Sequence, residues 1–455
     1  MFKYETDSRK VKPGQTFVAI KGYTVDGHDF IDKAIQNGAS AVIAGHEVDC
    51  SVPVTVVDDP AKYYQELLVK EYSHEFDKLK LIGITGTNGK TTSAWLAYQM
   101  LNLLGKKAAY IGTLGFYCGD YVEVLPNTSP EILTTYKLLE KAMELGCEYV
   151  VMEVSNFALD LKRIEGLKFI AGAFTNLSED HLDYHKTMEN YMNCKLKLTE
   201  YIKKDGVLCV NMDDPVSEKF KERFENTKTF GFGDYDYSII DDDIHPDHTD
   251  INFKVYGTDY KVTTNLTSKF NVYNYFTMFS MLHEIGFSCE DLIEKTKDLK
   301  APKGRCETYK VKDGFAVVDY AHTPDAVLKV VTAYKELAKG RIITVVGCGG
   351  DRDPMKRPIM GEIASEYSDY VIFTNDNPRT EDPNKIMEDI IAGVKKDNYE
   401  VCLDRRNAIK KALDMINKDD IVLLLGKGHE NYQILGHEKI HLDDSEEVLK
   451  YNENN

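Results

Sequence analysis

The sequence predicts an α/β protein of three domains, in which strands and helices alternate along most of the chain. Short apolar runs recur between amphipathic stretches, which is typical of parallel sheets whose strands are joined by helices. With 455 residues the chain is also too long for one ordinary domain. These patterns divide it into three blocks: residues 1–79, 80–301 and 302–455.

The first block is expected to form a small α/β domain. Three apolar runs are expected to be short strands: residues 17–20, 41–44 and 52–57. One helix is expected at residues 30–37, where Gly38 ends it, and another follows the third strand as far as about Lys70.

The second block is expected to contain a mostly parallel sheet with helices on both faces. Its first strand, residues 80–85, runs directly into a glycine-containing loop, and helical periodicity follows at 92–104. Further strands are expected at residues 108–111, 149–153, 171–175 and 206–211. An acidic stretch and alternating β-like segments then precede a helix that begins near Asn271.

The third block is expected to form a Rossmann-like domain. Strands that alternate with helices are expected at residues 315–319, 341–347, 370–374 and 420–425. Gly349 and Gly350 follow one of these strands, as in a Rossmann-like turn. The surrounding residues do not match G-x-G-x-x-G, so dinucleotide binding is disfavoured.

The composition argues against several classes of protein. A net charge of −18 disfavours a nucleic-acid partner, which would meet a basic face. No apolar run approaches the ~20 residues of a membrane helix, and the first ten residues carry no secretory signal. The nine cysteines form no C-x-x-C pair, which favours reduced thiols. We therefore expect a cytoplasmic protein with neither a nucleic-acid nor a membrane partner.

The glycine-containing loop is the most specific single motif in the sequence. It comprises Gly86, Thr87, Asn88, Gly89, Lys90, Thr91 and Thr92. A strand, a glycine loop and a helix in this order let backbone N–H groups and the helix N-terminus surround phosphate oxygens. Lys90 is expected to bridge the β- and γ-phosphates of ATP, and Thr91 or Thr92 to offer a hydroxyl to Mg²⁺. Ile84 stands where the longer Walker pattern has its first glycine.

Three other candidates are ambiguous when taken alone. Glu153 ends a predicted buried strand, where it would face the ligand crevice of an open α/β sheet, but a capping role is equally common. His181 follows another strand end, so a metal or phosphate role and a structural role are evenly balanced. Lys195 lies on an amphipathic segment, whose pattern alone predicts a solvated lysine.

Taken together, the motifs resemble those of the Mur ligases of peptidoglycan synthesis. They occur in the order T-G-T-N-G-K-T-T, M-E-V-S, T-N-L-S-x-D-H-L-D-Y-H, D-Y-A-H-T-P and D-N-P-R. More narrowly, they resemble the members that add the third residue of the stem peptide. The match spans the chain from Asp7-Ser8-Arg9 to His441-Leu442-Asp443.

The resemblance implies roles for many residues. It implies that Lys90, Glu153, His181 and Lys195 are catalytic, and that Thr91, Glu153, His181 and a carbamylated Lys195 hold Mg²⁺. Lys195 is preferred over Lys197 because it has the family spacing from Tyr191. Besides the loop, it implies ATP contacts from Asn271, Arg305, Asp319 and His322. It also implies UDP-substrate contacts from Ser8, Arg9, Thr128, Ser129, Ser155 and Arg163.

The last motif concerns the incoming amino acid. The resemblance implies contacts from Arg352, Asp376, Asn377, Arg379, Gly426 and Glu430, and meso-diaminopimelate as the substrate. The chemistry agrees, because a guanidinium such as that of Arg379 can grip the distal carboxylate of this diamino diacid. Lysine lacks that carboxylate and would leave the arginine without a partner.

The implied reaction is the ATP-dependent, ADP-forming addition of meso-diaminopimelate to UDP-MurNAc-L-Ala-D-Glu through an acyl phosphate. We expect the enzyme to be a monomer whose only partners are these small molecules. Asn156, Phe157 and Leu161 depart from the family pattern near the expected acid site. They favour the alternative of a paralogue that joins a different carboxylate to a diamino acid. A nucleotide-dependent binding or switch protein is disfavoured, because its mark would be the loss of one of four residues that are all present: Lys90, Glu153, His181 and Lys195.

Overall fold

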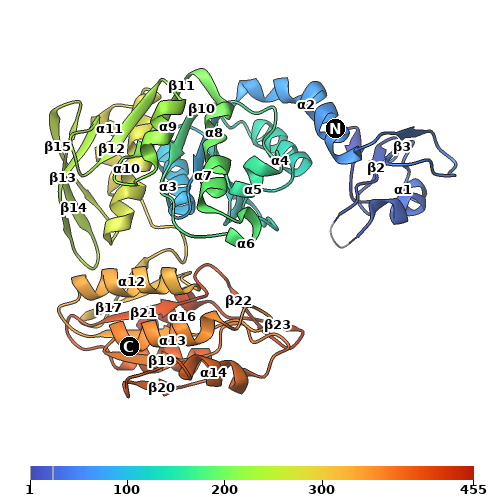
Figure 1. Cartoon of the computed structure of the whole chain (residues 1–455). Coiled ribbons are helices and arrows are strands. Elements are labelled where there is room, and N and C mark those ends of the chain that lie inside the picture. The colour runs from blue at the N-terminus through green and yellow to red at the C-terminus, as the bar shows by residue number, and fades with distance from the viewer. Residues whose placement is uncertain (1, 23–24, 455) are drawn as a thin grey trace.

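The chain forms three bodies in a computed structural model, which describes residues 2–22 and 25–454. Each body has its own main sheet, of four, eleven and six strands in chain order, and a two-stranded ribbon accompanies the third. Figure 1 shows the small N-terminal body beside the central one and the C-terminal body beneath it, with one helix, α12, on the side that faces the central body. The predicted α/β class is confirmed.

The N-terminal body is a parallel four-stranded sheet in sequence order. Its strands are β1 (Tyr4–Glu5), β2 (Thr16–Val18), β3 (Ala41–Ala44) and β4 (Val54–Val56). Its helices are η1 (Gly27–Phe30), α1 (Ile31–Gln36), α2 (Pro60–Tyr72) and η2 (Ser73–Lys78). Asp59 caps α2 by accepting from the N–H of Lys62, and Pro60 occupies the first turn, where its missing N–H costs nothing. Tyr64 and Leu68 of α2 are buried with residues of the central body, so this helix anchors the first body to the second.

The central body contains the eleven-stranded sheet, in the order β15-β14-β13-β12-β11-β10-β5-β9-β6-β7-β8. The strands are β5 (Lys80–Thr85), β6 (Ala108–Gly112), β7 (Gly115–Cys118), β8 (Tyr121–Glu123), β9 (Tyr149–Glu153), β10 (Phe169–Phe174), β11 (Ile202–Asn211), β12 (Thr227–Gly231), β13 (Tyr237–Ile244), β14 (Thr249–Val255) and β15 (Thr258–Thr264). Its interior is parallel, whereas β7–β8 and β13–β15 are antiparallel extensions at the two edges.

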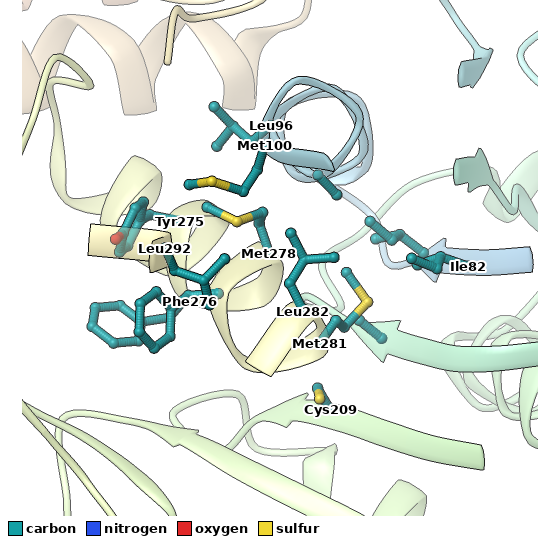
Figure 2. Close-up of a cluster of buried hydrophobic side chains, with 14 of the residues drawn as sticks. Ile82, Leu96, Met100, Cys209, Tyr275, Phe276, Met278, Met281, Leu282 and Leu292 are labelled. Atoms are coloured by element: carbon teal, nitrogen blue, oxygen red, sulfur yellow. The ribbon is translucent and has the colours of Figure 1, made fainter. Parts of the chain in front are cut away.

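Helices cover both faces of the central sheet. They are α3 (Lys90–Leu103), α4 (Ile132–Glu144), α5 (Asn156–Asp160), α6 (Leu182–His185), α7 (Met188–Leu196), α8 (Leu198–Tyr201), α9 (Ser217–Arg223), α10 (Lys269–Glu284) and α11 (Cys289–Thr296). On one face, α3, α10 and α11 form a dense apolar core, in which Met100, Met278 and Leu282 meet beside the sheet (Figure 2). Because strand β5 lies between β9 and β10, three strand ends with their loops meet at one edge. Such a switch point is where open α/β sheets bind ligands.

The C-terminal body has the sheet order β16-β17-β21-β18-β19-β20, parallel except for β16. The strands are β16 (Glu307–Val311), β17 (Gly314–Asp319), β18 (Ile342–Val346), β19 (Tyr370–Phe373), β20 (Tyr399–Val401) and β21 (Ile421–Leu425), with the ribbon β22 (Tyr432–Leu435) and β23 (Glu438–His441). One face packs on α12 (Pro324–Leu337), α13 (Lys356–Tyr367) and α14 (Pro383–Ile391), the other on α15 (Arg405–Asp414) and α16 (Asp444–Asn454). The ends of β17, β18, β19 and β21 therefore meet at a common edge.

Candidate active site

The loop between β5 and α3 is the phosphate-binding candidate, and its shape depends on two glycines. Gly86 (φ 147°) and Gly89 (φ 85°) both adopt backbone angles that favour glycine. Lys90 begins α3, and its Nζ folds back to donate to the carbonyl oxygens of Gly86 and Thr87, both at 2.8 Å. Burial lowers the pKa of Lys90, and the negative charge of Glu153 acts in the opposite direction. A helix N-terminus and an amine thus converge on one small volume, as polyphosphate binding requires.

Replacing Gly86 with alanine is expected to weaken ADP binding at least about tenfold, a loss of about 1.4 kcal/mol or more. A Cβ at Gly86 would lie 1.9 Å from Thr175 Oγ1, so the loop would have to move. Gly105→Ala is the control, because its φ of 74° is also positive and favours glycine, while nothing lies within 4 Å of the added Cβ. Titration calorimetry with ADP measures both variants. Equal losses in the two variants would show that general strain, rather than loop geometry, sets the affinity.

Glu153 lies at the end of β9 and is the centre of an oxygen-rich cluster. Its Oε2 accepts hydrogen bonds from Thr91 Oγ1 at 2.8 Å and Thr113 Oγ1 at 3.2 Å. Its Oε1 accepts from the Thr113 N–H at 2.8 Å and from the Tyr110 hydroxyl, whose pKa is raised by burial and then by the Glu153 charge. Carboxylate and hydroxyl oxygens are the ligands that Mg²⁺ prefers. Thr91 and Glu153 therefore fit the predicted metal.

Lys195 is completely buried on α7, in contrast to the solvated lysine that the amphipathic pattern alone predicted. Its Nζ donates to the Gly86 carbonyl at 2.7 Å and lies 4.4 Å from the centre of the Tyr191 ring. Burial, and next the positive charge of Lys90, lower the pKa of Lys195 well below its ordinary value. A larger fraction of this side chain is therefore the neutral amine, which is the nucleophilic form.

His181 lies in the sharply turned segment after β10, with a φ of 53°. Its Nε2 is 3.4 Å from Asp180 Oδ2, and its ring stands edge-on to Phe157, with centroids 5.4 Å apart. Asp180 was not among the predicted site residues. Burial has the largest influence on the pKa of Lys90 and lowers it. The charge of Glu153 raises this pKa, and the charge of Asp180 raises it to a smaller extent. Asp180 therefore adds a second carboxylate to the electrostatic environment of the phosphate loop.

Four predicted substrate contacts are connected to Glu153 by a chain of hydrogen bonds. Thr128 Oγ1 and Thr113 Oγ1 are 3.0 Å apart, and Ser129 Oγ donates to the Glu153 carbonyl at 2.9 Å. Ser129 accepts two further hydrogen bonds: its Oγ accepts from the Ser155 N–H at 3.1 Å, and its carbonyl accepts from Arg163 Nη1 at 2.8 Å. The structure thus brings Thr128, Ser129, Ser155 and Arg163 to the same edge of the sheet as the catalytic candidates.

Three residues that depart from the family pattern differ in their surroundings. Asn156 is buried, and its Nδ2 is 2.9 Å from His185 Nε2. Phe157 packs against His181, so it adjoins a predicted metal ligand. Leu161 is exposed, and its carbonyl accepts from Gln65 Nε2 at 3.1 Å.

Ser8 and Arg9 lie apart from this cluster, in the N-terminal body. Ser8 is buried, and its carbonyl accepts from Asn37 Nδ2 at 2.8 Å. Arg9 is exposed and bonds Asp7 through Nε at 2.9 Å and Nη2 at 2.8 Å. The same arginine lowers the pKa of Asp7 to about 2. Arg9 is thus exposed in this body but already paired with the carboxylate of Asp7.

Two bodies supply the nucleotide candidates outside the loop. Asn271, in the first turn of α10, is buried and donates to the Thr267 carbonyl at 2.8 Å. Arg305, from the third block, lies over the Tyr320 ring at 4.8 Å, and its buried Nε has no hydrogen-bond partner among the described residues. The Arg305 charge also contributes to lowering the pKa of Lys90, after the effects of burial and the two carboxylates. Arg305 is therefore electrostatically coupled to the loop of the central body.

Asp319 and His322 lie close to Arg305 at the end of β17. The carboxylate of Asp319 accepts from the N–H groups of Cys306 at 2.9 Å and Ala321 at 2.8 Å. Burial raises the pKa of Asp319, and the charge of Arg305 opposes that shift. Nδ1 of His322 is 2.8 Å from the Tyr320 carbonyl, and burial lowers its pKa, which favours the neutral imidazole.

A pocket of about 350 Å³ lies at the common edge of the C-terminal sheet. All six predicted amino-acid contacts line it: Arg352, Asp376, Asn377, Arg379, Gly426 and Glu430. Arg379 has a φ of 53°, and its Nη1 donates to the Gly350 carbonyl at 2.7 Å. Asn377 Nδ2 donates to Glu430 Oε2 at 2.9 Å. Charged groups of both signs in one small pocket suit a zwitterionic amino acid.

Sequence reasoning missed several residues that support these groups. Lys427 is completely buried, and its Nζ donates to Glu430 at 3.0 Å and to Asn377 Oδ1 at 3.3 Å. Lys356 lines the amino-acid pocket, and its Nζ donates to the His322 carbonyl at 2.9 Å. Lys427 lies between Gly426 and Gly428, next to two predicted contacts of the amino acid, Gly426 and Glu430. This position in the motif was the sequence signal that could have identified Lys427. For Lys356 and for Tyr110 beside Glu153, the pattern carried no comparable signal.

Comparisons with known proteins agree with this geometry. Three family models match the chain: "Mur ligase family, catalytic domain" over residues 4–73, "Mur ligase middle domain" over 84–282, and "Mur ligase, glutamate ligase domain" over 304–428. Together they account for most of the chain.

Similar proteins of known name cover almost the whole length. A UDP-N-acetylmuramoyl-L-alanyl-D-glutamate--2,6-diaminopimelate ligase of Clostridium acetobutylicum is 43% identical over 453 residues, covering 98% of this chain and 93% of the relative. A protein of the corresponding name from Bacillus cereus is 41% identical, covering 97% and 92%. A solved structure of such a ligase has a TM-score of 0.73 and 31% identity, covering 100% of this chain and 95% of its own. A MurF ligase from Thermotoga maritima in complex with ADP shares the fold, with a TM-score of 0.68 at 21% identity, covering 99% of this chain and 97% of its own.

Proposed function

The chain belongs to the Mur ligase family, and from this we propose that it is the ATP-dependent ligase that adds meso-diaminopimelate to UDP-MurNAc-L-Ala-D-Glu in peptidoglycan precursor synthesis. The reaction forms an amide bond and releases ADP and phosphate. The observation that carries this proposal is the 43% identity, over nearly the full length of both chains, to a ligase of that name. The site adds a phosphate loop, an oxygen-rich metal site and a pocket for a zwitterion.

In the first step, a free carboxylate of the dipeptide attacks the γ-phosphorus of ATP. The bond from that phosphorus to the β,γ-bridging oxygen breaks, and ADP leaves with the electron pair. Lys90 and the N–H groups of the loop hold the phosphates in line and stabilise their charge. Thr91, Glu153 and His181 would hold Mg²⁺, which neutralises charge on the phosphates when it is bound.

In the second step, the neutral amine of meso-diaminopimelate attacks the acyl carbon of the acyl phosphate. The carbon–oxygen bond to the phosphoryl group breaks, inorganic phosphate leaves, and the amine loses a proton as the amide forms. Arg379 and Glu430 in the C-terminal pocket orient this amine. Because the acid is activated on the central body, the two bodies have to approach each other and exclude water.

We further propose a division of labour that follows the three blocks. Residues 1–79 bind the uridine end of the acid substrate through Ser8 and Arg9, residues 80–301 bind ATP and activate the carboxylate, and residues 302–455 bind the amino acid. Lys195 is carbamylated in the active enzyme, which converts the buried amine into a carboxylate-like metal ligand. The low pKa of the Lys195 amine supports this, because only the neutral amine adds carbon dioxide.

The substrates are small molecules, and we propose that the enzyme acts as a monomer in the cytoplasm. None of the helices in the described part of the chain is both long and apolar enough to span a membrane. The substrates themselves are polar and charged, as expected for reactions in aqueous solution.

The proposed function is tested by measuring phosphate release together with the mass of the product. With ATP, Mg²⁺, UDP-MurNAc-L-Ala-D-Glu and meso-diaminopimelate, we expect one phosphate for each amide formed, and no product when any one substrate is omitted. Other UDP-linked acids test the alternative that Phe157, beside His181, favours. Turnover with a different acid, but none with UDP-MurNAc-L-Ala-D-Glu, would contradict the proposal and support that paralogue.

A further inference from the structure

The tip of the β13–β14 hairpin gathers two histidines and two aspartates on one face. Side chains alternate along a strand, so Asp243 and His245 share a face on one side of the turn, as His248 and Asp250 do on the other. Asp243 and Asp250 are direct cross-strand partners, and the His245 N–H donates to the His248 carbonyl at 2.8 Å. Thr249 points to the opposite, buried side. All four side chains therefore project together from the tip.

The ligand atoms of this group already lie close together. One ring nitrogen each of His245 and His248 and a carboxylate oxygen of Asp250 all lie within 4.8 Å of one another. The two imidazole rings are stacked, with centroids 4.3 Å apart and an interplanar angle of 17°. Asp243 Oδ2 is 3.3 Å from His245 Nε2. The side chains of His245, His248 and Asp243 are exposed enough to rotate, as the stacked rings must in order to point one nitrogen each at the same ion.

Neighbouring groups orient two of the ligands. His248 Nδ1 is 2.7 Å from Asp247 Oδ1, so a proton on Nδ1 leaves the Nε2 lone pair free for a metal. Asp250 Oδ1 accepts a hydrogen bond from the Thr263 hydroxyl on β15, and this bond holds the carboxylate in place. Hydrogen-bonded histidine and carboxylate ligands are the usual arrangement at protein metal sites.

The charge distribution also favours a cation. Asp243 and Asp250 stand directly opposite each other, and like charges in that position destabilise an antiparallel pair. A bound cation would remove this repulsion. Imidazole nitrogens combined with carboxylates select borderline divalent ions such as Zn²⁺, Co²⁺ or Ni²⁺ over Mg²⁺, which prefers oxygen alone.

We propose that the tip of the β13–β14 hairpin binds one divalent transition-metal ion through His245, His248 and Asp250, with Asp243 as the fourth ligand. This site is separate from the Mg²⁺ site at Glu153 and is independent of the proposed function. Thr249, between two of the ligands, donates through Oγ1 to the Leu266 carbonyl at 2.7 Å. Thr267 follows Leu266 in the chain, and its hydroxyl oxygen lies 2.6 Å from the hydroxyl oxygen of Tyr334 in the C-terminal body. The ion would thus brace the hairpin close to a contact between two bodies.

The test is a Co²⁺ titration of the tag-free, full-length chain after chelator treatment, with excess Mg²⁺ to fill the oxygen sites. We expect the wild-type chain to bind one more equivalent of Co²⁺ than the His245→Ala/His248→Ala variant does. The absorption spectrum of the Co²⁺-loaded wild-type chain should lack the near-ultraviolet band that cysteine thiolate ligands produce. Asp250→Asn, which preserves the side-chain volume, should weaken binding by roughly 10-fold or more.

The matched control is His74→Ala/His437→Ala, which removes two other histidines and should retain the extra equivalent. Melting curves in chelator establish that each variant is folded, and added Zn²⁺ should raise the melting temperature of the wild type and the control only. Equal stoichiometry in the His245→Ala/His248→Ala variant and the wild type would overturn the proposal. A thiolate band that persists in that variant would instead assign the ion to cysteine.

Discussion

Replacing Lys195 with alanine is expected to lower kcat by about 10³-fold or more, equivalent to about 4 kcal/mol of transition-state stabilisation. The side chain is fully buried, and its Nζ bonds the Gly86 carbonyl at the start of the phosphate loop. Loss of the carboxylate-like metal ligand proposed at this position would remove charge stabilisation where the phosphoryl group is transferred. Steady-state phosphate release, at saturating concentrations of all three substrates, measures the effect.

Chemical rescue separates the role of Lys195 in catalysis from a role in folding. A short carboxylate such as formate or acetate should restore part of the activity of Lys195→Ala by occupying the place of the carbamate. Lys197→Ala is the matched control, because Lys197 lies two residues away and pairs with Asp160 at 2.9 Å. It should retain most of the activity. Full activity of Lys195→Ala without any added carboxylate would refute the carbamate role.

The lowered pKa of Lys195 gives this modification a pH dependence. A folded-state pKa below the ordinary value of 10.5 keeps more of the amine neutral at a given pH than in a free lysine. At a fixed supply of carbon dioxide, carbamylation should therefore form at pH values where an exposed lysine is almost fully protonated. It should be lost only as the pH falls below the shifted pKa. Intact-mass measurement under native conditions detects the added carbon dioxide.

The second large effect is expected at Arg379, as a loss of about 10²- to 10³-fold in kcat/KM for meso-diaminopimelate in Arg379→Ala. This corresponds to about 3–4 kcal/mol, the cost of leaving a buried charged partner unpaired. Nη1 of Arg379 is held by the Gly350 carbonyl at 2.7 Å, which presents the guanidinium to the pocket. Its φ of 53° is left-handed, a conformation that costs an arginine some backbone strain.

A panel of amino acids tests the same assignment in the wild-type enzyme. We expect meso-diaminopimelate to be used far better than lysine, because lysine lacks the distal carboxylate that Arg379 is proposed to bind. Arg379→Lys keeps the charge but not the planar two-pronged donor, so it should restore only a small part of the lost activity. Equal use of lysine and meso-diaminopimelate by the wild type would show that Arg379 does not select the substrate.

The sequence predicted the α/β architecture because its strands are short apolar runs bounded by turn residues. Residues 41–44, 80–85 and 149–153 form strands with the predicted bounds. Helix α3 begins at Lys90 rather than Thr92, because the loop glycine next to it already serves as its N-cap. For the edge strands β13–β15 the sequence predicts only β-like segments, since an antiparallel extension has no helical spacer to identify it.

The geometry of the candidate site was less accessible to sequence reasoning. Burial of Lys195 depends on how α7 packs against the loop, and the amphipathic pattern of the helix does not reveal this. The electrostatic coupling of Arg305 to Lys90 depends on the placement of two separate bodies. Asp180 lies beside the predicted His181, but nothing in its spacing distinguished it from the neighbouring acidic residues. These features arise from tertiary structure rather than from periodicity.

The pocket proposed for the amino acid is lined by residues of the C-terminal body alone, between Tyr320 and Tyr432. The phosphate loop and Glu153 belong entirely to the central sheet. In the proposed mechanism, recognition of the amine rests on the C-terminal body and activation of the acid rests mainly on the central one. The C-terminal body also supplies the predicted ATP contacts Arg305, Asp319 and His322, and His322 lines the same pocket. A ligase of this design can therefore acquire a new amine partner by remodelling that pocket only where these three residues are kept.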